Sequence, residues 1–197
     1  QEFIPDAPAV PKAFRTAAAA GDIRTFVGGS ESVVVWLEPE MPEGFEAPIA
    51  VGLATRASES LLVPVAPNLG GTVEMTASLR ELFASDRLFV TYDAKAQVRR
   101  LRAAGWPVPA RWEDVMLMSY VINPGLPSHA LANIARDRLK QDILARKDAQ
   151  KTAPLFALEH EIGSSALGAY HQYLGEKPDV VASLRTVLEP DLRRDDA

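Results

Sequence analysis

Short apolar runs separated by polar or proline-rich turns occupy the first third of the chain, a pattern typical of β-strands. The run at residues 33–37 is rich in β-branched side chains, which predicts a strand buried on both faces. Two further runs, at residues 49–55 and 60–65, are joined by a polar turn. Pro64 has no backbone N–H and marks a strand end or a sheet edge. We expect these three strands to form an antiparallel meander.

Apolar residues at helical spacing dominate the rest of the chain. Thr76 is a candidate N-cap, and a fourth strand is predicted at residues 87–91. The predicted helices cover residues 23–27, 76–84, 94–104, 113–122, 130–139, 155–174 and 180–188. Residues 1–20 are rich in proline and alanine and are expected to form an arm or linker. The order of elements predicts an α/β domain with a mixed sheet.

Composition narrows the class of protein. The 197 residues are enough for one domain with a substantial core. No apolar run approaches the roughly 20 residues that span a bilayer, and cysteine is absent, which together favour a cytoplasmic protein with no membrane partner. The net charge of −5 argues against strong autonomous DNA binding, because phosphate contacts need a basic surface. The missing initiator Met suggests a piece of a longer chain.

The most informative segment is residues 112–139, which read WEDVMLMSYVINPGLPSHALANIARDRL. It resembles the helix–loop–helix in the 3'–5' exonuclease domain of family A DNA polymerases, the DNA polymerase I group. The matching positions are Asp114, Met116, Leu117, Ser119, Tyr120, Asn123, Pro124, Leu131 and Ala132. The similarity extends over roughly residues 33–174, through the triplet Val51-Gly52-Leu53 and the segment FVTYDAKAQ at residues 89–97.

This resemblance implies a ribonuclease H-like α/β fold, with an antiparallel three-strand meander, added parallel strands and flanking helices. It also implies a division of the chain. Residues 1–26 would be an N-terminal arm or linker and residues 27–176 the exonuclease-like domain. Residues 177–197 would form a C-terminal helix and tail that lead toward a polymerase domain.

Members of the family hydrolyse phosphodiesters with two divalent metal ions held by four carboxylates. Ungapped counting from Val51 places the first two carboxylate positions at Leu37 and Pro39. The third falls at Gln97, and the fourth, on the long last helix, near Ser165. None of these side chains replaces a carboxylate as a ligand of Mg²⁺ or Mn²⁺. The resemblance therefore predicts a degenerate site that holds no cofactor.

One alternative keeps an active site. A one-residue slip would align Glu38 and Glu40 with the family's Asp-x-Glu pair, and Asp93 would be a third ligand. Mg²⁺ or Mn²⁺ would then be the cofactor. Against this, the slip turns the whole first strand over, and nothing replaces the fourth carboxylate.

Other charged and aromatic residues have simpler explanations. Arg99, Arg100 and Arg102 are expected to form a solvated face of their helix rather than a nucleic-acid contact. Trp36 adjoins the first carboxylate position, where a large side chain would fill space that active relatives give to nucleotide and metals. The three histidines lack a metal-ligand pattern.

The sequence favours an inactive exonuclease-like domain of a DNA polymerase I, acting as a scaffold. Its partners would be the polymerase domain of the same chain and, through the full enzyme, DNA. Two alternatives stay open: an active exonuclease using Glu38, Glu40 and Asp93, and a free-standing nuclease-like adaptor that does not cleave.

Overall fold

The computed structural model describes residues 12–38, 48–144 and 164–195; within the last range, side chains are described for residues 171–194. The strands are β1 (Ala13–Thr16), β2 (Ser32–Glu38), β3 (Ala50–Arg56), β4 (Glu59–Pro64), β5 (Leu88–Thr91) and β6 (Arg111–Asp114). The helices are α1 (Ala20–Val27), α2 (Val73–Phe83), α3 (Ala94–Ala103), α4 (Val115–Ile122), α5 (Leu131–Leu139) and α7 (Ser164–Asp195), with a 3-10 turn, η1, at Pro67–Leu69.

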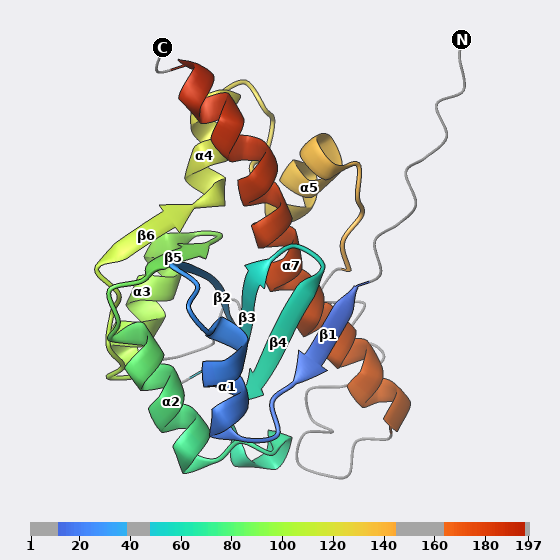
Figure 1. Cartoon of the computed structure of the whole chain (residues 1–197). Coiled ribbons are helices and arrows are strands. Elements are labelled where there is room, and N and C mark those ends of the chain that lie inside the picture. The colour runs from blue at the N-terminus through green and yellow to red at the C-terminus, as the bar shows by residue number, and fades with distance from the viewer. Residues whose placement is uncertain (1–11, 39–47, 145–163, 196–197) are drawn as a thin grey trace.

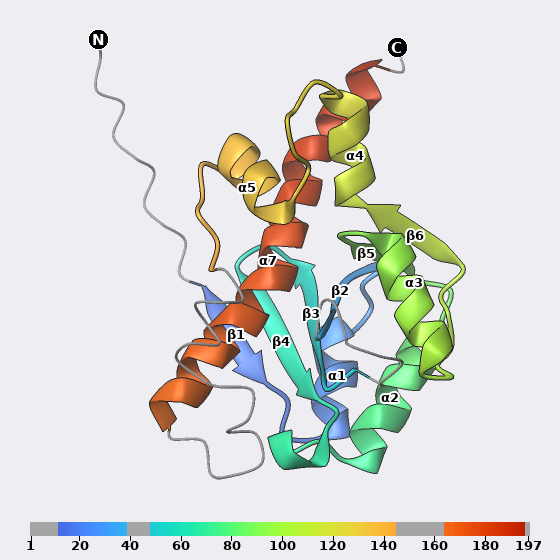
Figure 2. The ribbon, with the colours of Figure 1, turned by 180° about the vertical axis from the view of Figure 1, so that it is seen from behind.

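The strands form one mixed sheet in the order β1-β4-β3-β2-β5-β6. Strands β2, β3 and β4 make the expected antiparallel meander. Strands β5 and β6 extend it in parallel beside β2, and β1 pairs in parallel with β4. Figures 1 and 2 show the sheet between two groups of helices. The predicted α/β fold class, a ribonuclease H-like mixed sheet flanked by helices, is confirmed.

Each face of the sheet has its own hydrophobic core. Strand residues such as Val33, Val35 and Leu37 pack with α1, α2 and α3. The alternate residues Val34 and Trp36 pack with α4, α5 and α7. This alternation is the two-residue period of a strand, and it explains why residues 33–37 of β2 are all apolar.

The amino-terminal arm predicted for residues 1–20 is interrupted by structure. Residues Ala13–Thr16 form β1, whose partner in the sheet is β4. Strand β1 has only four residues and a largely exposed pattern, so it carries little of the period-two signal that predicts a strand. The pairing with β4 is a long-range contact that local pattern does not reveal.

Two helix starts differ from prediction because the capping side chain stands at another residue. Thr72, rather than Thr76, is the N-cap of α2, and its Oγ1 accepts a hydrogen bond from the N–H of Met75 at 3.2 Å. The helix predicted at residues 113–122 begins at Val115, because Asp114 caps it and Glu113 belongs to β6.

Two predicted helices near the carboxyl end are parts of one. Helix α7 continues through Pro178, although proline removes the N–H that would bond to the carbonyl of Leu174. Strand β3 approaches closely here: a Cβ on Gly52 would lie 3.2 Å from the Leu174 oxygen and 3.1 Å from Pro178 Cγ. Tight packing against β3 therefore holds the helix together across the proline. The start predicted at residue 155 lies outside the described residues.

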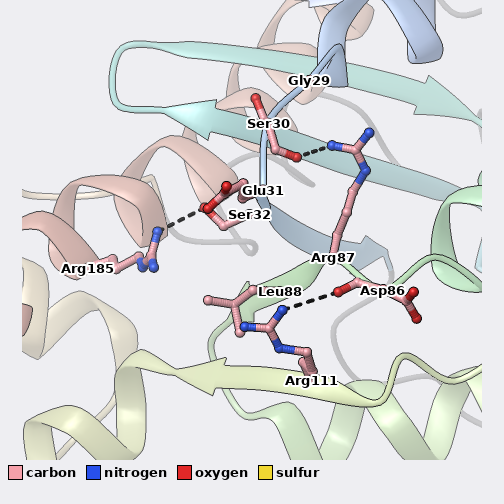
Figure 3. A pocket seen from close by; sticks show the side chains of 9 residues that line it. All are labelled: Gly29, Ser30, Glu31, Ser32, Asp86, Arg87, Leu88, Arg111 and Arg185. Atoms are coloured by element: carbon pink, nitrogen blue, oxygen red, sulfur yellow. Dashed lines mark hydrogen bonds between the residues drawn. The ribbon is translucent and has the colours of Figure 1, made fainter.

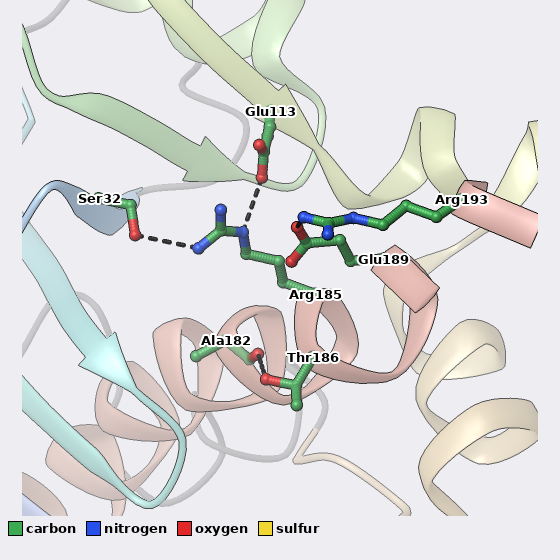
Figure 4. Close-up of polar contacts among 7 residues, drawn as sticks. All are labelled: Ser32, Glu113, Ala182, Arg185, Thr186, Glu189 and Arg193. Atoms are coloured by element: carbon green, nitrogen blue, oxygen red, sulfur yellow. Dashed lines mark hydrogen bonds and ion pairs between the residues drawn. The ribbon is translucent and has the colours of Figure 1, made fainter. Parts of the chain in front are cut away.

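Arg185, in the C-terminal half of α7, joins this helix to β6 and β2. Its Nε donates to Glu113 Oε2 of β6 at 2.7 Å and its Nη1 to Ser32 Oγ of β2 at 3.0 Å (Figure 4). Lysine offers a single ammonium in place of this fork. We expect Arg185→Lys to lower the free energy of unfolding by about 1 kcal/mol, measured by urea denaturation. Arg193→Lys is the control, because the Arg193–Glu189 pair on the same helix is exposed, and no loss is expected.

Candidate active site

The candidate site lies where β2 and β5 separate. Their parallel pairing runs from Ser32↔Leu88 to Val34↔Val90. Beyond this pairing, side chains instead of β5 donate hydrogen bonds to the carbonyls of β2. Thr91 Oγ1 donates to the Val35 oxygen at 2.8 Å, and Arg100 Nη1 donates to the Leu37 oxygen. Splits at the carboxyl ends of parallel strands are where open α/β sheets bind ligands, but this split is closed by a hydroxyl and a guanidinium.

The two faces of β2 carry different candidates. Leu37 is fully buried among the apolar residues that face α1 and α2. Trp36 points to the opposite face, which α7 covers, and is also buried. Alternation places Glu38, 1% exposed, on the same face as Trp36. Leu37 is thus a core residue, whereas Trp36 and Glu38 lie on the face of the sheet that α7 covers.

Helix α3 supplies the other wall. Gln97 and Arg100, one turn apart, are both buried, with exposures of 2% and 6%. The expectation that Arg100 belongs to a solvated basic face is therefore wrong; Arg99 and Arg102 are exposed as expected. Arginine is rarely buried unless its guanidinium has hydrogen-bond partners. Here the partner is the carbonyl of Leu37 at the end of β2, and the sequence does not reveal that this carbonyl lacks a partner strand. Gln97, which ungapped counting assigns to the third carboxylate position, is an amide in the interior.

Asp93 and Asp114 organise the start of α3. Asp93 has a left-handed backbone, with φ of 54°, and its Oδ1 accepts the N–H of Ala96 at 3.1 Å. Asp114 accepts three backbone N–H groups: that of Asp93 at 3.0 Å, that of Ala94 at 2.8 Å and that of Met116 at 2.9 Å. Asp114 thus joins the starts of α3 and α4. Both carboxylates are engaged with backbone donors, as helix caps are.

The pKa of Asp114 is raised, chiefly by burial, and the nearby charge of Asp93 raises it further; its three N–H bonds oppose the shift. The extra stability that protonation of this carboxyl brings is therefore fully present below its unfolded pKa and is lost as the pH rises through its folded pKa. We expect Asp93→Asn to lower the pKa of Asp114, because the neighbouring charge is removed. A carboxyl-carbon NMR titration of both proteins measures this; an unchanged pKa would contradict it.

The residues at this site do not fit two divalent cations. An apolar side chain stands at Leu37, an amide at Gln97 and a cation at Arg100, whose charge opposes a metal ion nearby. Within residues 12–38, 48–144 and 164–195, no three Asp, Glu, His or Cys side chains gather as a metal site would need. Pro39 and Glu40 lie outside the described residues. Ser165 belongs to α7 by its backbone, and its side chain is not described.

A hollow of about 750 Å³ lies at the opposite ends of β2, β5 and β6 (Figure 3). Its arginines fasten loops: Arg87 donates to the carbonyl of Ser30, and Arg111 Nη1 donates to that of Asp86 at 3.3 Å. These are the amino ends of the parallel strands, away from the β2–β5 split. The hollow is therefore separate from the site that the family resemblance indicates.

Comparison with models of protein families and with curated protein sequences gives no match. Solved structures do resemble the chain. NrnC of Brucella melitensis, with bound Mg²⁺, has a TM-score of 0.65 and 14% identity, over 95% of this chain and 84% of that one. The structure described as the POL domain of Pol1 from M. smegmatis, in complex with DNA primer-template and dNTP, has a TM-score of 0.63 and 16% identity, over 92% and 28%. RNase D of Trypanosoma brucei has a TM-score of 0.65 and 10% identity, over 89% and 64%.

At these identities the likeness is one of fold. The chain shares its fold with these nuclease structures, in agreement with the ribonuclease H-like sheet described above. It spans only about a quarter of the polymerase chain and less than two thirds of RNase D. No helix in the described part of the chain is both long enough and apolar enough to cross a membrane.

Proposed function

We propose that this chain is a catalytically inactive 3'–5' exonuclease-like domain of a DNA polymerase I, where it serves as a scaffold for the polymerase domain. DNA would be bound by the full enzyme, in replication or repair. The order of motifs in residues 33–174 supports the polymerase assignment, as does the likeness to the M. smegmatis Pol1 structure. The acidic net charge of −5 suits a domain that does not grip DNA unaided.

The proposed absence of activity rests on one observation: the gap between the ends of β2 and β5 is closed by side chains. A guanidinium bonded to the Leu37 carbonyl occupies the strand end, with Leu37 and Gln97 buried beside it. A two-metal site needs hard, anionic oxygen ligands and room for a phosphate. Apolar, amide and cationic side chains supply neither the charge nor the open space.

An active nuclease with a rearranged site is the second candidate. Glu38 and Asp93 both carry oxygen ligands, and Glu38 lies on the face of β2 that α7 covers. Gln97 Oε1, which has no hydrogen-bond partner among the described residues, is a further neutral oxygen. Mg²⁺ or Mn²⁺ would be its cofactor, and Glu40 would complete the set.

A free-standing domain is the third candidate. The likeness to NrnC covers 84% of that chain, so this fold at nearly this length exists outside a polymerase. A free-standing adaptor would bind protein or nucleic acid without cleaving it. The natural reading frame distinguishes this candidate from the first proposal. A frame that continues into polymerase motifs would exclude the free-standing adaptor.

The deciding experiment incubates the purified protein with 3'-labelled single-stranded DNA and either Mg²⁺ or Mn²⁺. We expect no release of labelled nucleotide above a protein-free control, and calorimetry at millimolar Mn²⁺ should show no binding. The matched variant is Glu38→Ala. Metal-dependent release of mononucleotides that this variant abolishes would overturn the proposal in favour of the active enzyme.

A further inference from the structure

Helix α4 is apolar on two opposite sides. Val115, Met118 and Ser119 are buried against the core beside α7. Leu117, Tyr120 and Val121, at the spacing of one helical stripe, are 56%, 48% and 64% exposed. A helix that is apolar all round is ordinarily buried all round. We call the exposed stripe of Leu117, Tyr120 and Val121 the α4 face.

The α4 face is held in a fixed shape. Tyr120 stacks on the ring of His129, with ring centroids 3.6 Å apart. His129 Nδ1 lies 2.9 Å from Ser119 Oγ, and the His129 carbonyl accepts a hydrogen bond from Tyr92 at 3.1 Å. These contacts join the segment after α4 to α4 itself and to Tyr92, the residue that follows β5. Tyrosine is one of the residue types enriched in binding hot spots, and here two exposed aliphatic side chains flank it.

The place of the α4 face indicates what covers it. Helix α7 packs against α4, and both views show its last turns beside α4 (Figures 1 and 2). The exposed charges there are paired within the helix: Arg193 with Glu189 at 2.6 Å and Arg194 with Asp191 at 2.9 Å. Because these arginines are already paired, they present little unpaired positive charge to a phosphate or an acidic partner. The apolar stripe is the feature that remains for recognition.

We propose that the α4 face is the surface on which the domain that follows this one in the same polypeptide docks. The inference rests on the proposed function, in which a polymerase domain follows α7. A chain leaving α7 at Asp195 emerges beside helix α4, so a following domain reaches this helix after a short connection. The docked domain presents an apolar groove that takes up Leu117, Tyr120 and Val121.

The test compares amide hydrogen exchange in the 197-residue protein and in the polypeptide of the full reading frame. We expect the amides of α4 to exchange at least about tenfold more slowly in the full polypeptide. The double variant Leu117→Ser/Val121→Ser should remove this protection. Val73→Ser is the matched control, because Val73 is 81% exposed on α2 and should leave the protection unchanged.

Each other outcome overturns a different statement. A frame that ends without a following domain overturns the proposed function and this inference together. A frame that continues into polymerase motifs, with equal α4 exchange in both proteins, overturns only the docking surface. Sedimentation of the 197-residue protein as a dimer that Leu117→Ser/Val121→Ser dissociates would assign the α4 face to a second copy instead.

Discussion

The variant Leu37→Asp is expected to unfold the protein instead of restoring a metal ligand. Leu37 is fully buried in the cluster between the sheet and helices α1 and α2. Losing the leucine costs roughly 2–3 kcal/mol of burial, and a carboxyl among apolar side chains adds a desolvation penalty. We expect a total loss of at least about 4 kcal/mol, a large part of the stability of an ordinary domain.

The control for this variant is Leu37→Met, which keeps volume and polarity and should cost less than about 1.5 kcal/mol. Both variants are measured by urea denaturation followed by tryptophan fluorescence. If Leu37→Asp melted like the parent and gained Mn²⁺ binding, Leu37 would be a vacated ligand position and not a core residue. The ungapped count from Val51 would then identify the metal site correctly.

The central strands are well predicted because their signal is local. Strands β2, β3 and β4 begin and end within a residue or so of the apolar runs that predict them. The pairing of β3 with β4 follows from the short turn between their two runs. The edge strands β1 and β6 were not predicted, since each has four residues and few buried side chains, and each exists only through its pairing partner.

The candidate site was predicted less completely. Sequence alone identifies Leu37 and Gln97 as unfit to hold metal ions, and both prove to be buried. It does not reveal that Arg100 bonds to the end of β2, because that contact joins residues 63 positions apart. Nor does it reveal which face of β2 meets α7. That depends on three-dimensional packing, which places Trp36 and Glu38 there.

Asp114 shows that a residue within the resemblance can have a structural role. The resemblance includes Asp114 in the segment that matches the family most clearly, yet its contacts are three backbone N–H groups. Those bonds set the direction of α3 and so bring Gln97 and Arg100 to the end of β2. A match of this kind therefore supports the fold, and it carries no information about catalysis.

Removing this carboxyl should be the second most damaging change. Asp114→Ala leaves three N–H donors at two helix starts without an acceptor, in a position 8% exposed. Loss of a cap costs about 0.5–2 kcal/mol, and each buried unpaired donor about 1–3 kcal/mol. Because water can reach some of these donors after truncation, we expect a loss of about 3 kcal/mol in the free energy of unfolding.

Two companion variants separate capping from charge. Asp114→Asn keeps one acceptor oxygen but turns an amide N–H₂ toward a backbone donor, so it should lie between Asp114→Ala and the parent. Asp93→Asn keeps a cap oxygen and tolerates the left-handed backbone, so it should change stability by less than about 0.5 kcal/mol. Hydrogen exchange at Ala94 and Met116 should accelerate in Asp114→Ala alone. If Asp114→Ala were as stable as the parent, the junction of α3 and α4 would depend on packing, and the position of Arg100 at the end of β2 would need another cause.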